Sequence, residues 1–529
     1  MKLSRRALLK ASLGATQVGL LAKLGLSPSV ARAAGGTGPT KLLTIYFPGG
    51  WMPTDLFCPL SATEITRLIP SKTQYLNDPV FYDAADVTNL DGSGNAMGAN
   101  GNARLRVPKL WDETSLAAGA PDSRGGGMTS PNGWSWKQYK LWENTAVVHG
   151  VDMGTAGHLA GAISAMCGIA GNDFRSPSLH SHVANALYDQ YGDARPLPCV
   201  QLWEAPSLNA LNLRPEAAPI SVYSTQLMGP IFDEGDNSAW TGFRGRTPQS
   251  ATDFSGKAIA DVPVTALEAQ LAARVRALKG VNGGTDALLE GLYDNYQGIS
   301  RLMAQDVVTK VKATAGVENL QKPFWAPSSG GFFSVDIGAG AVSDGGDKYD
   351  RNFKSVLQLL KSGVTTSLSV VCEGPNQFNF DTHPANGHLP QFVNVRAAFE
   401  ATGRLLGEMK ATQIGGGRTL LDDTLVLLVS EFSRTWPNSQ SCDHWQYTSV
   451  AFVGGGVQPN QMIGNYDTVG KSGTAIGYTG VPCDVVEETG AAANRPIRSA
   501  DVIQTALRIM GISDVRIPGG SGEIVGVKA

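Results

Sequence analysis

The chain has little of several features that mark common classes of protein. Only 17% of its residues are charged and no run of Lys or Arg occurs, which argues against a nucleic-acid partner. No uninterrupted apolar run reaches about 18 residues, so we expect no stable membrane span after processing. The six cysteines show no CxxC or zinc-ribbon spacing. One or two disulfides fit an exported protein, but the spacing does not define their pairing.

The N-terminus predicts export in the folded state. Adjacent arginines in "SRRALLK", a mildly apolar run at 11–26 and the small-x-small site "ARA" at 31–33 are typical of a twin-arginine signal. We therefore expect a signal peptide at 1–33, engagement with the twin-arginine export machinery, and a periplasmic or secreted protein. The signal carries six basic residues and no acidic ones, so the mature chain has 37 basic and 46 acidic residues and a net charge of −9.

Apolar runs alternate with helical patterns along the rest of the chain. This order predicts an α/β fold of three layers, α/β/α, with a mostly parallel sheet covered on both faces. We interpret 34–529 as a single domain with loop-rich and helical insertions at about 60–135 and 205–350. The predicted strands are 41–47, 145–148, 198–203, 366–371, 425–429 and 449–453. The predicted helices are 158–167, 179–191, 265–279, 286–313, 350–361, 389–410 and 499–510.

Ionisable residues follow four of the predicted strands, although the chain has only seven histidines. Ligands bind at the carboxyl ends of the strands in such sheets, so these residues are expected to meet. The residues concerned are Asp55, His149, His158, Asp381, His383, Glu431, Arg434, Asp443 and His444.

Carboxylate and imidazole together predict a divalent metal site. These ligands suit zinc, manganese or iron better than calcium. Taken singly, each residue has an ordinary explanation: the segment at Asp381 can be a turn, and Arg434 can form a surface ion pair. The joint placement on strand ends favours the metal site.

Three motifs resemble a known family. "FDTH" at 380–383, "SEFSRT" at 430–435 and "CDHW" at 442–445 are similar to motifs of the twin-arginine-exported, sulfatase-like bacterial family called domain of unknown function number fifteen-oh-one. That family is regarded as part of the alkaline phosphatase superfamily. "FPGGWMPTD" at 47–55 and "ADVIQTALRIMGI" at 500–512 extend the resemblance towards both ends of the mature chain.

The resemblance implies a phosphatase- or sulfatase-like fold with one or two metal ions, of which zinc or manganese is expected. Arg434 would bind an anionic group of the substrate as a bidentate fork. Glu431 would be a further ligand or would orient one. The metal ligands carried over by position are Asp55, Asp381, His383, Asp443 and His444.

The nucleophile departs from the superfamily pattern. No C-x-P-x-R or C-x-A-x-R segment occurs, so a formylglycine sulfatase is excluded. The nucleophile position falls on His158, and Thr155 is the nearest hydroxyl. Either His158 is a ligand and activated water attacks, or the site is degenerate and only binds.

Two functions are therefore compatible with the sequence. The first is an exported metal-dependent hydrolase whose substrate is a small anionic phosphate or sulfate ester. The second is a non-catalytic exported protein that keeps the fold and binds an envelope component. Metal content and turnover separate the two functions.

Overall fold

The computed structural model describes part of the chain. The predicted signal peptide, the helix predicted at 265–279 and nearly all of the helix predicted at 286–313 lie outside it. The described residues are 38–52, 56–57, 87–94, 97, 102–108, 135–171, 176–192, 194–202, 213–214, 217–222, 311, 314, 346–372, 380–381, 388–435, 443–472, 475–518 and 521–529.

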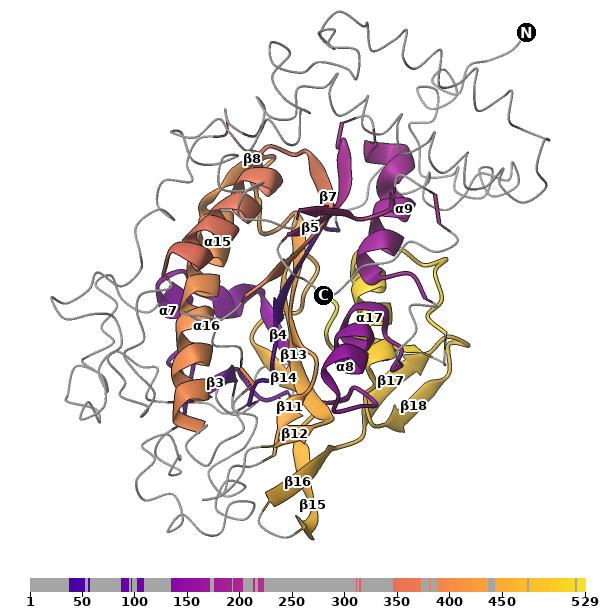
Figure 1. The fold of residues 1–529 in the computed structure, drawn as a ribbon. Helices are drawn as coiled ribbons and strands as arrows, with labels where there is room; N and C mark the ends of the chain where they lie inside the picture. Colours follow the sequence, from indigo (N-terminus) through magenta and orange to yellow (C-terminus); the bar gives the residue numbers. More distant parts are fainter. Residues whose placement is uncertain are drawn as a thin grey trace, which may run out of the picture.

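An eight-stranded sheet forms the centre of this structure, with the order β14-β4-β13-β10-β1-β7-β5-β6 (Figure 1). β13 is antiparallel to both of its neighbours and every other pairing is parallel, so the mostly parallel sheet is confirmed. The bounds are β1 Lys41–Phe47, β4 Thr145–Asp152, β5 Leu197–Leu202, β6 Ile220–Val222, β7 Thr365–Val371, β10 Thr424–Ser430, β13 Tyr447–Gly454 and β14 Gln461–Ile463.

Helices cover both faces of the sheet (Figure 1). α7, α15 and α16 lie on one face, and α8, α9 and α17 lie on the other. Strand alternation explains the two cores: in β1, Leu43, Ile45 and Phe47 enter one core, whereas Leu42 and Tyr46 enter the other. The bounds are α7 Ser135–Gln138, α8 His158–Cys167, α9 Leu179–Tyr191, α15 Gly346–Lys361, α16 His388–Ala411 and α17 Ser499–Ile509.

The four predicted strands that end near Phe47, Val371, Val429 and Val453 are neighbours, in the order β7-β1-β10-β13. A mostly parallel sheet led us to expect that the loops after all four strands converge on one pocket, and this expectation is wrong for β13. The loop after β13 does not join the others, because this strand runs the opposite way and begins at the edge where the others end. Neighbouring antiparallel strands need no crossover, so the chain leaves β10 and returns to β13 at one edge.

Smaller elements surround the sheet. The short segment η5 (Leu141–Asn144) precedes β4, and a three-stranded sheet β18-β17-β19 packs beside α17. The remaining strands form two-stranded sheets. The bounds of all strands outside the central sheet are β2 Val87–Asn89, β3 Arg106–Pro108, β8 Gln413–Gly415, β9 Arg418–Thr419, β11 Ser433–Arg434, β12 His444–Trp445, β15 Tyr466–Ser472, β16 Ala475–Gly480, β17 Cys483–Glu487, β18 Ala492–Arg495 and β19 Gly522–Ile524.

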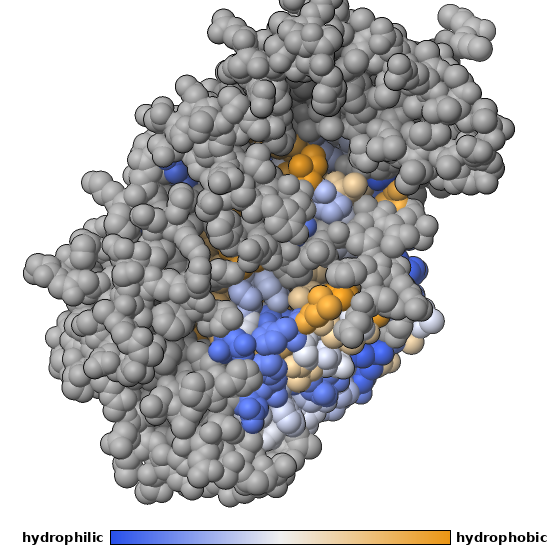
Figure 2. Space-filling view, viewed as in Figure 1, coloured by the Kyte–Doolittle hydropathy of each residue, from blue (hydrophilic) through white to orange (hydrophobic). Residues whose placement is uncertain are grey.

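The described surface is mixed in character. Figure 2 shows hydrophilic residues gathered in its lower part, with a hydrophobic group beside them. Among the described residues, no helix has the length and hydropathy needed to cross a bilayer. The four described cysteines, Cys167, Cys199, Cys372 and Cys483, are buried free thiols, so none of them forms a predicted disulfide. Cys58 and Cys442 lie outside the described residues.

Candidate metal centre

A glycine loop after β1 builds the base of the site. Gly49 and Gly50 have φ angles of +102° and +79°, which side-chain-bearing residues rarely adopt. A Cβ on Gly49 would lie 2.2 Å from the backbone nitrogen of Asp381, so no side chain fits there. This close approach brings the segment after β7 against the end of β1.

Arg434 ties these two segments together from β11. Its side chain is fully buried, and its guanidinium donates to the carbonyl oxygens of Gly49 and Gly50. A further hydrogen bond of 2.5 Å reaches Oδ1 of Asp381. Burial alone would raise the pKa of Asp381, but the hydrogen bond and the positive charge of Arg434 outweigh it and hold the pKa at about 2. Asp381 is therefore a fixed carboxylate at neutral pH.

Glu431 follows β10 and is buried, with 1% of its surface exposed. Its Oε2 accepts a hydrogen bond of 2.7 Å from the Tyr46 hydroxyl, and its Oε1 accepts one of 2.6 Å from the Gly49 amide. Nδ1 of His158 lies 3.0 Å from the same Oε1. A buried carboxylate needs such donors, and together they fix its orientation.

His158 begins α8, directly after the N-cap residue Gly157. Nδ1 donates to Glu431, so Nε2 of the neutral ring keeps its lone pair, and this atom lies 3.3 Å from Oδ2 of Asp381. The hydrogen bond from Nδ1 to Glu431 is the largest cause that raises the pKa of His158 above its usual value.

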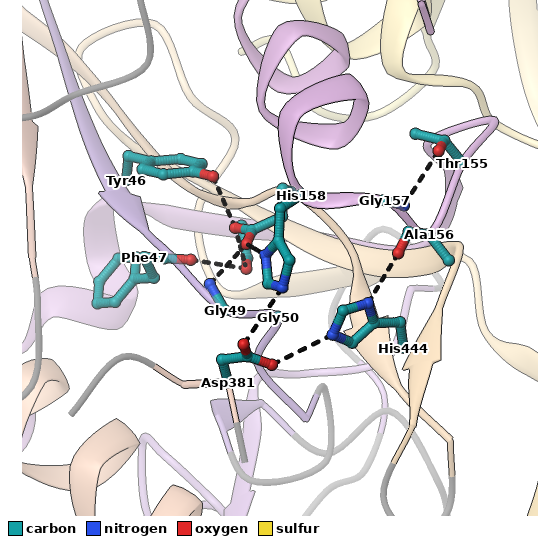
Figure 3. A network of polar contacts seen from close by, with 12 residues as sticks. Tyr46, Phe47, Gly49, Gly50, Thr155, Ala156, Gly157, His158, Asp381 and His444 are labelled. Carbon is teal, nitrogen blue, oxygen red and sulfur yellow. Dashed lines mark hydrogen bonds and ion pairs between the residues drawn. The ribbon is translucent and has the colours of Figure 1, made fainter. Parts of the chain in front are cut away.

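His444 repeats this arrangement from β12. Its Nδ1 lies 2.9 Å from the carbonyl oxygen of Ala156, which can only accept, so Nδ1 carries the proton. Its Nε2 faces Oδ1 of Asp381 at 3.2 Å. Burial lowers the pKa of His444, although the contact with Asp381 opposes the shift. Figure 3 shows both imidazoles directed at the Asp381 carboxylate.

When both imidazoles are neutral, their Nε2 lone pairs thus point at the two oxygens of the Asp381 carboxylate, which are also acceptors. Such a group is stable only when a positive charge lies among these atoms, either as extra ring protons or as a cation. The ligand atoms of His158, Asp381 and His444 lie within 4.8 Å of one another. Two ligands about 2.0–2.1 Å from a tetrahedral zinc are about 3.3 Å apart, which fits the two nitrogen–oxygen distances. The residues present therefore fit a divalent ion, with the carboxylate–histidine support that such ligands usually have.

Some of the predicted site residues lie elsewhere. Asp55 and His383 are outside the described residues, so their predicted roles as ligands stay predictions. Asp443 is exposed and is not part of the group of three. Thr155 accepts a hydrogen bond of 3.1 Å from the Gly157 amide, and Figure 3 shows its hydroxyl turned to that amide and not to Asp381. It stabilises the turn before α8.

Two expectations need correction. Arg434 is not placed to grip a substrate anion, because its guanidinium is buried and bonded to two carbonyls and to Asp381. It supports the site instead. His149 was expected after a strand, but β4 extends to Asp152 through its pairing with β13, so His149 is a buried core residue bonded to Ser449.

Sequence reasoning missed the roles of Tyr46, Ala156 and Phe432. Tyr46 lies in the apolar strand β1, Phe432 is an apolar residue just after β10, and Ala156 contributes only its backbone carbonyl. The Gly-Gly pair at 49–50 was the visible signal of a close approach, but its partners lie more than 300 positions away in the sequence.

Comparisons with known proteins give a family match and a weak match to a solved structure. A comparison with curated proteins finds no match. Among solved structures, the phosphonate monoester hydrolase SpPMH from Silicibacter pomeroyi is 11% identical, over 77% of this chain and 73% of that one. The TM-score is 0.24, and at that value the likeness carries no argument about fold or activity.

The family comparison agrees with the motifs. The matching family model, described as "Protein of unknown function (DUF1501)", spans residues 364–519. This segment contains Asp381, Glu431, Arg434 and His444, whereas His158 lies before it. Over residues 364–519, the chain matches the model of this family of unknown function.

Proposed function

We propose that the protein is an exported metal-dependent hydrolase of small anionic esters, with phosphate or sulfate esters as the substrate class. One observation carries the proposal: the Nε2 atoms of His158 and His444 both face the Asp381 carboxylate, while both Nδ1 atoms are engaged elsewhere. Two nitrogens and one oxygen are a donor set for zinc or manganese. Membership of the alkaline phosphatase superfamily is part of this proposal.

The residues of the site would have two roles, as ligands of the ion and as groups that orient those ligands. His158, Asp381 and His444 would hold the ion, and Glu431, Ala156 and Arg434 orient these three side chains. A bound divalent ion would supply Lewis acidity and lower the pKa of a water molecule held on it. The side chain of His158 is 46% exposed, so the group is open to solvent on that side, as a catalytic site requires.

A substrate anion would find little other positive charge in the described site. Arg434 is already neutralised by Asp381 and has no exposed surface. The ion itself would therefore attract the ester group. His158 and His444 would hold the ion as neutral ligands, and Asp381 would hold it as an anionic one.

The test is metal content followed by turnover. Full-length protein, exported and purified without chelators, is analysed for metal and then assayed on aryl phosphate monoesters, phosphate diesters, phosphonate monoesters and aryl sulfates. We expect about one zinc or manganese per chain and hydrolysis of at least one ester class. His158→Gln and His444→Gln should lose both the metal and the activity, whereas Thr155→Ala should keep both.

A second function, non-catalytic binding of an envelope component, is favoured by the burial of Arg434 and the hydrogen bond accepted by Thr155. The predicted anion fork and hydroxyl nucleophile are then both structural. Stoichiometric metal without turnover on any of the four ester classes would support this function over hydrolysis.

A further inference from the structure

Phe432 packs against both imidazoles of the candidate metal centre. Its side chain is fully buried. Its ring centroid lies 5.0 Å from that of His158 and 4.3 Å from that of His444. The two imidazole centroids are 4.5 Å apart, and their planes are nearly perpendicular at 84°. The three rings therefore form one packed group around the Nε2 atoms.

The Phe432 ring is itself confined. A Cβ placed on Gly50 would come within 2.4 Å of it, so the glycine backbone lies directly against the ring. The guanidinium carbon of Arg434 is 5.8 Å from the ring centroid. Because close-packed protein interiors deform little, the Phe432 ring is a fixed surface against which the two imidazoles pack.

The contact with Phe432 restrains a motion of the two imidazole rings that their hydrogen bonds leave free. The bond from His158 to Glu431 and the bond from His444 to Ala156 each hold one ring atom, and each ring can still tilt about that atom. Contact with a fixed aromatic ring removes this tilt. The positions of both Nε2 atoms are then set relative to Asp381.

We propose that Phe432 is a positioning residue that sets the angle between the two imidazoles and thereby the affinity and selectivity of the metal site. The inference rests on the proposed metal-dependent function. A rigid pair of imidazoles with one carboxylate favours the tetrahedral geometry of zinc over the octahedral, oxygen-rich shell that manganese prefers. Small errors in ligand position weaken such sites, which is why supporting residues matter.

The test compares metal binding by full-length wild-type protein and Phe432→Leu. Both are stripped of metal and titrated with Zn²⁺ and with Mn²⁺ against a chromophoric chelator, and both are loaded with Co²⁺ for absorption spectra. We expect Phe432→Leu to weaken zinc binding by at least about tenfold, the lower end for loss of a supporting residue. Manganese binding should weaken less, and the cobalt bands should shift or lose intensity.

Phe399→Leu is the matched control. Phe399 is also fully buried and stacks on Trp136 with centroids 4.0 Å apart, in α16 and away from the site. The Phe399→Leu substitution should lower the melting temperature without changing the zinc affinity or the cobalt spectrum. Should Phe432→Leu not fold, Phe432→Met keeps more of the side-chain volume, removes the flat ring and is measured instead.

Two results would overturn the inference, and they differ. A folded Phe432 variant with the zinc affinity, zinc-to-manganese ratio and cobalt spectrum of the wild type would refute the positioning role alone. Wild-type protein that binds none of the three ions would overturn the proposed function, and the role of Phe432 with it.

Discussion

Oε1 of Glu431 lies 3.0 Å from Nδ1 of His158 and joins the end of β10 to the start of α8. The Tyr46 hydroxyl and the Gly49 amide donate to this carboxylate as well. Glutamine has the same shape but only one acceptor oxygen. We expect Glu431→Gln to weaken zinc binding by about 10–100-fold, since His158 then donates to a neutral amide oxygen in place of a carboxylate.

Tyr46→Phe is the control for Glu431→Gln. It removes one donor, to Oε2, and leaves Oε1 bonded to both Gly49 and His158. The loss of zinc affinity should be smaller than for Glu431→Gln in the same chelator competition. Equal affinities for Glu431→Gln and wild type would show that Glu431 does not orient His158.

Arg434→Lys should destabilise the protein and also weaken the metal site. Lysine keeps the charge but lacks the planar fork that reaches Gly49, Gly50 and Asp381 at once. Buried acceptors left without donors and a disturbed buried ion pair predict a loss of about 2–4 kcal/mol in the free energy of unfolding. Urea unfolding and metal analysis measure the two effects.

Arg418→Lys provides the comparison, because Arg418 is partly exposed and its ion pair with Asp423 is 3.5 Å long. The free energy of unfolding of Arg418→Lys should differ from that of the wild type by less than about 1 kcal/mol. If Arg434→Lys kept full stability and metal content but bound an anionic ester more weakly, Arg434 would be the anion fork that the sequence predicts.

The four residues from Glu431 to Arg434 show how much of the candidate site can be predicted from the sequence. Their place after an apolar strand led us to expect Glu431 and Arg434 in the site, whereas Phe432 was missed. Glu431 orients a histidine, Phe432 packs under two imidazoles and Arg434 holds a carboxylate. The position of a residue after a strand says at which end of the sheet it lies. It does not say whether a distant glycine loop will bury its side chain.

The direction of β13 and the length of β4 could not be predicted from the sequence. The apolar run that became β13 is the same whether the strand runs parallel or antiparallel, so the sequence did not reveal its reversal. His149 looked like a strand exit because polar residues follow Val148. Pairing of β4 with β13 continues to Asp152 and carries His149 into the core. Both outcomes depend on tertiary pairing, which a local pattern does not encode.

The export signal gives a separate prediction. Replacing Arg5 and Arg6 with Lys should leave the precursor in the cytoplasm, because the twin-arginine receptor requires the guanidinium pair of the motif. Fractionation followed by immunoblotting measures the precursor, and single replacement of Lys10 by Arg is the control. Normal periplasmic accumulation of the double variant would rule out the twin-arginine route.

His444→Ala and Asp443→Ala should differ, although the two residues are neighbours. His444 aims Nε2 at Asp381, whereas Asp443 is exposed and lies outside the group of three. We expect His444→Ala to lose most of its bound metal and Asp443→Ala to retain it, with both proteins folded by circular dichroism. Reduced metal in folded Asp443→Ala would return Asp443 to the ligand set that the family resemblance implies.

Acid stability should report on the buried histidines of the core. Burial lowers the pKa of His149 and of His180 to about 3 and that of His182 to about 4, against about 6.5 in the unfolded chain. Below pH 6.5 the unfolded state binds protons that the folded state does not, so stability falls as pH falls. Above pH 6.5 both states are neutral at these positions, and the effect vanishes.

His149→Gln should therefore flatten this acid dependence. Glutamine can still hydrogen-bond to Ser449, which lies 2.7 Å from Nδ1 of His149, but it does not titrate. Each fully buried histidine costs about 1.4 kcal/mol per pH unit below 6.5, so the variant should lose about 2 kcal/mol less than wild type between pH 7 and pH 5. Urea unfolding across this range measures the slope. Ser449→Ala should lower stability at every pH and keep the wild-type slope, because His149 remains buried. A slope in His149→Gln that matches wild type would mean that His149 takes up its proton in the folded protein.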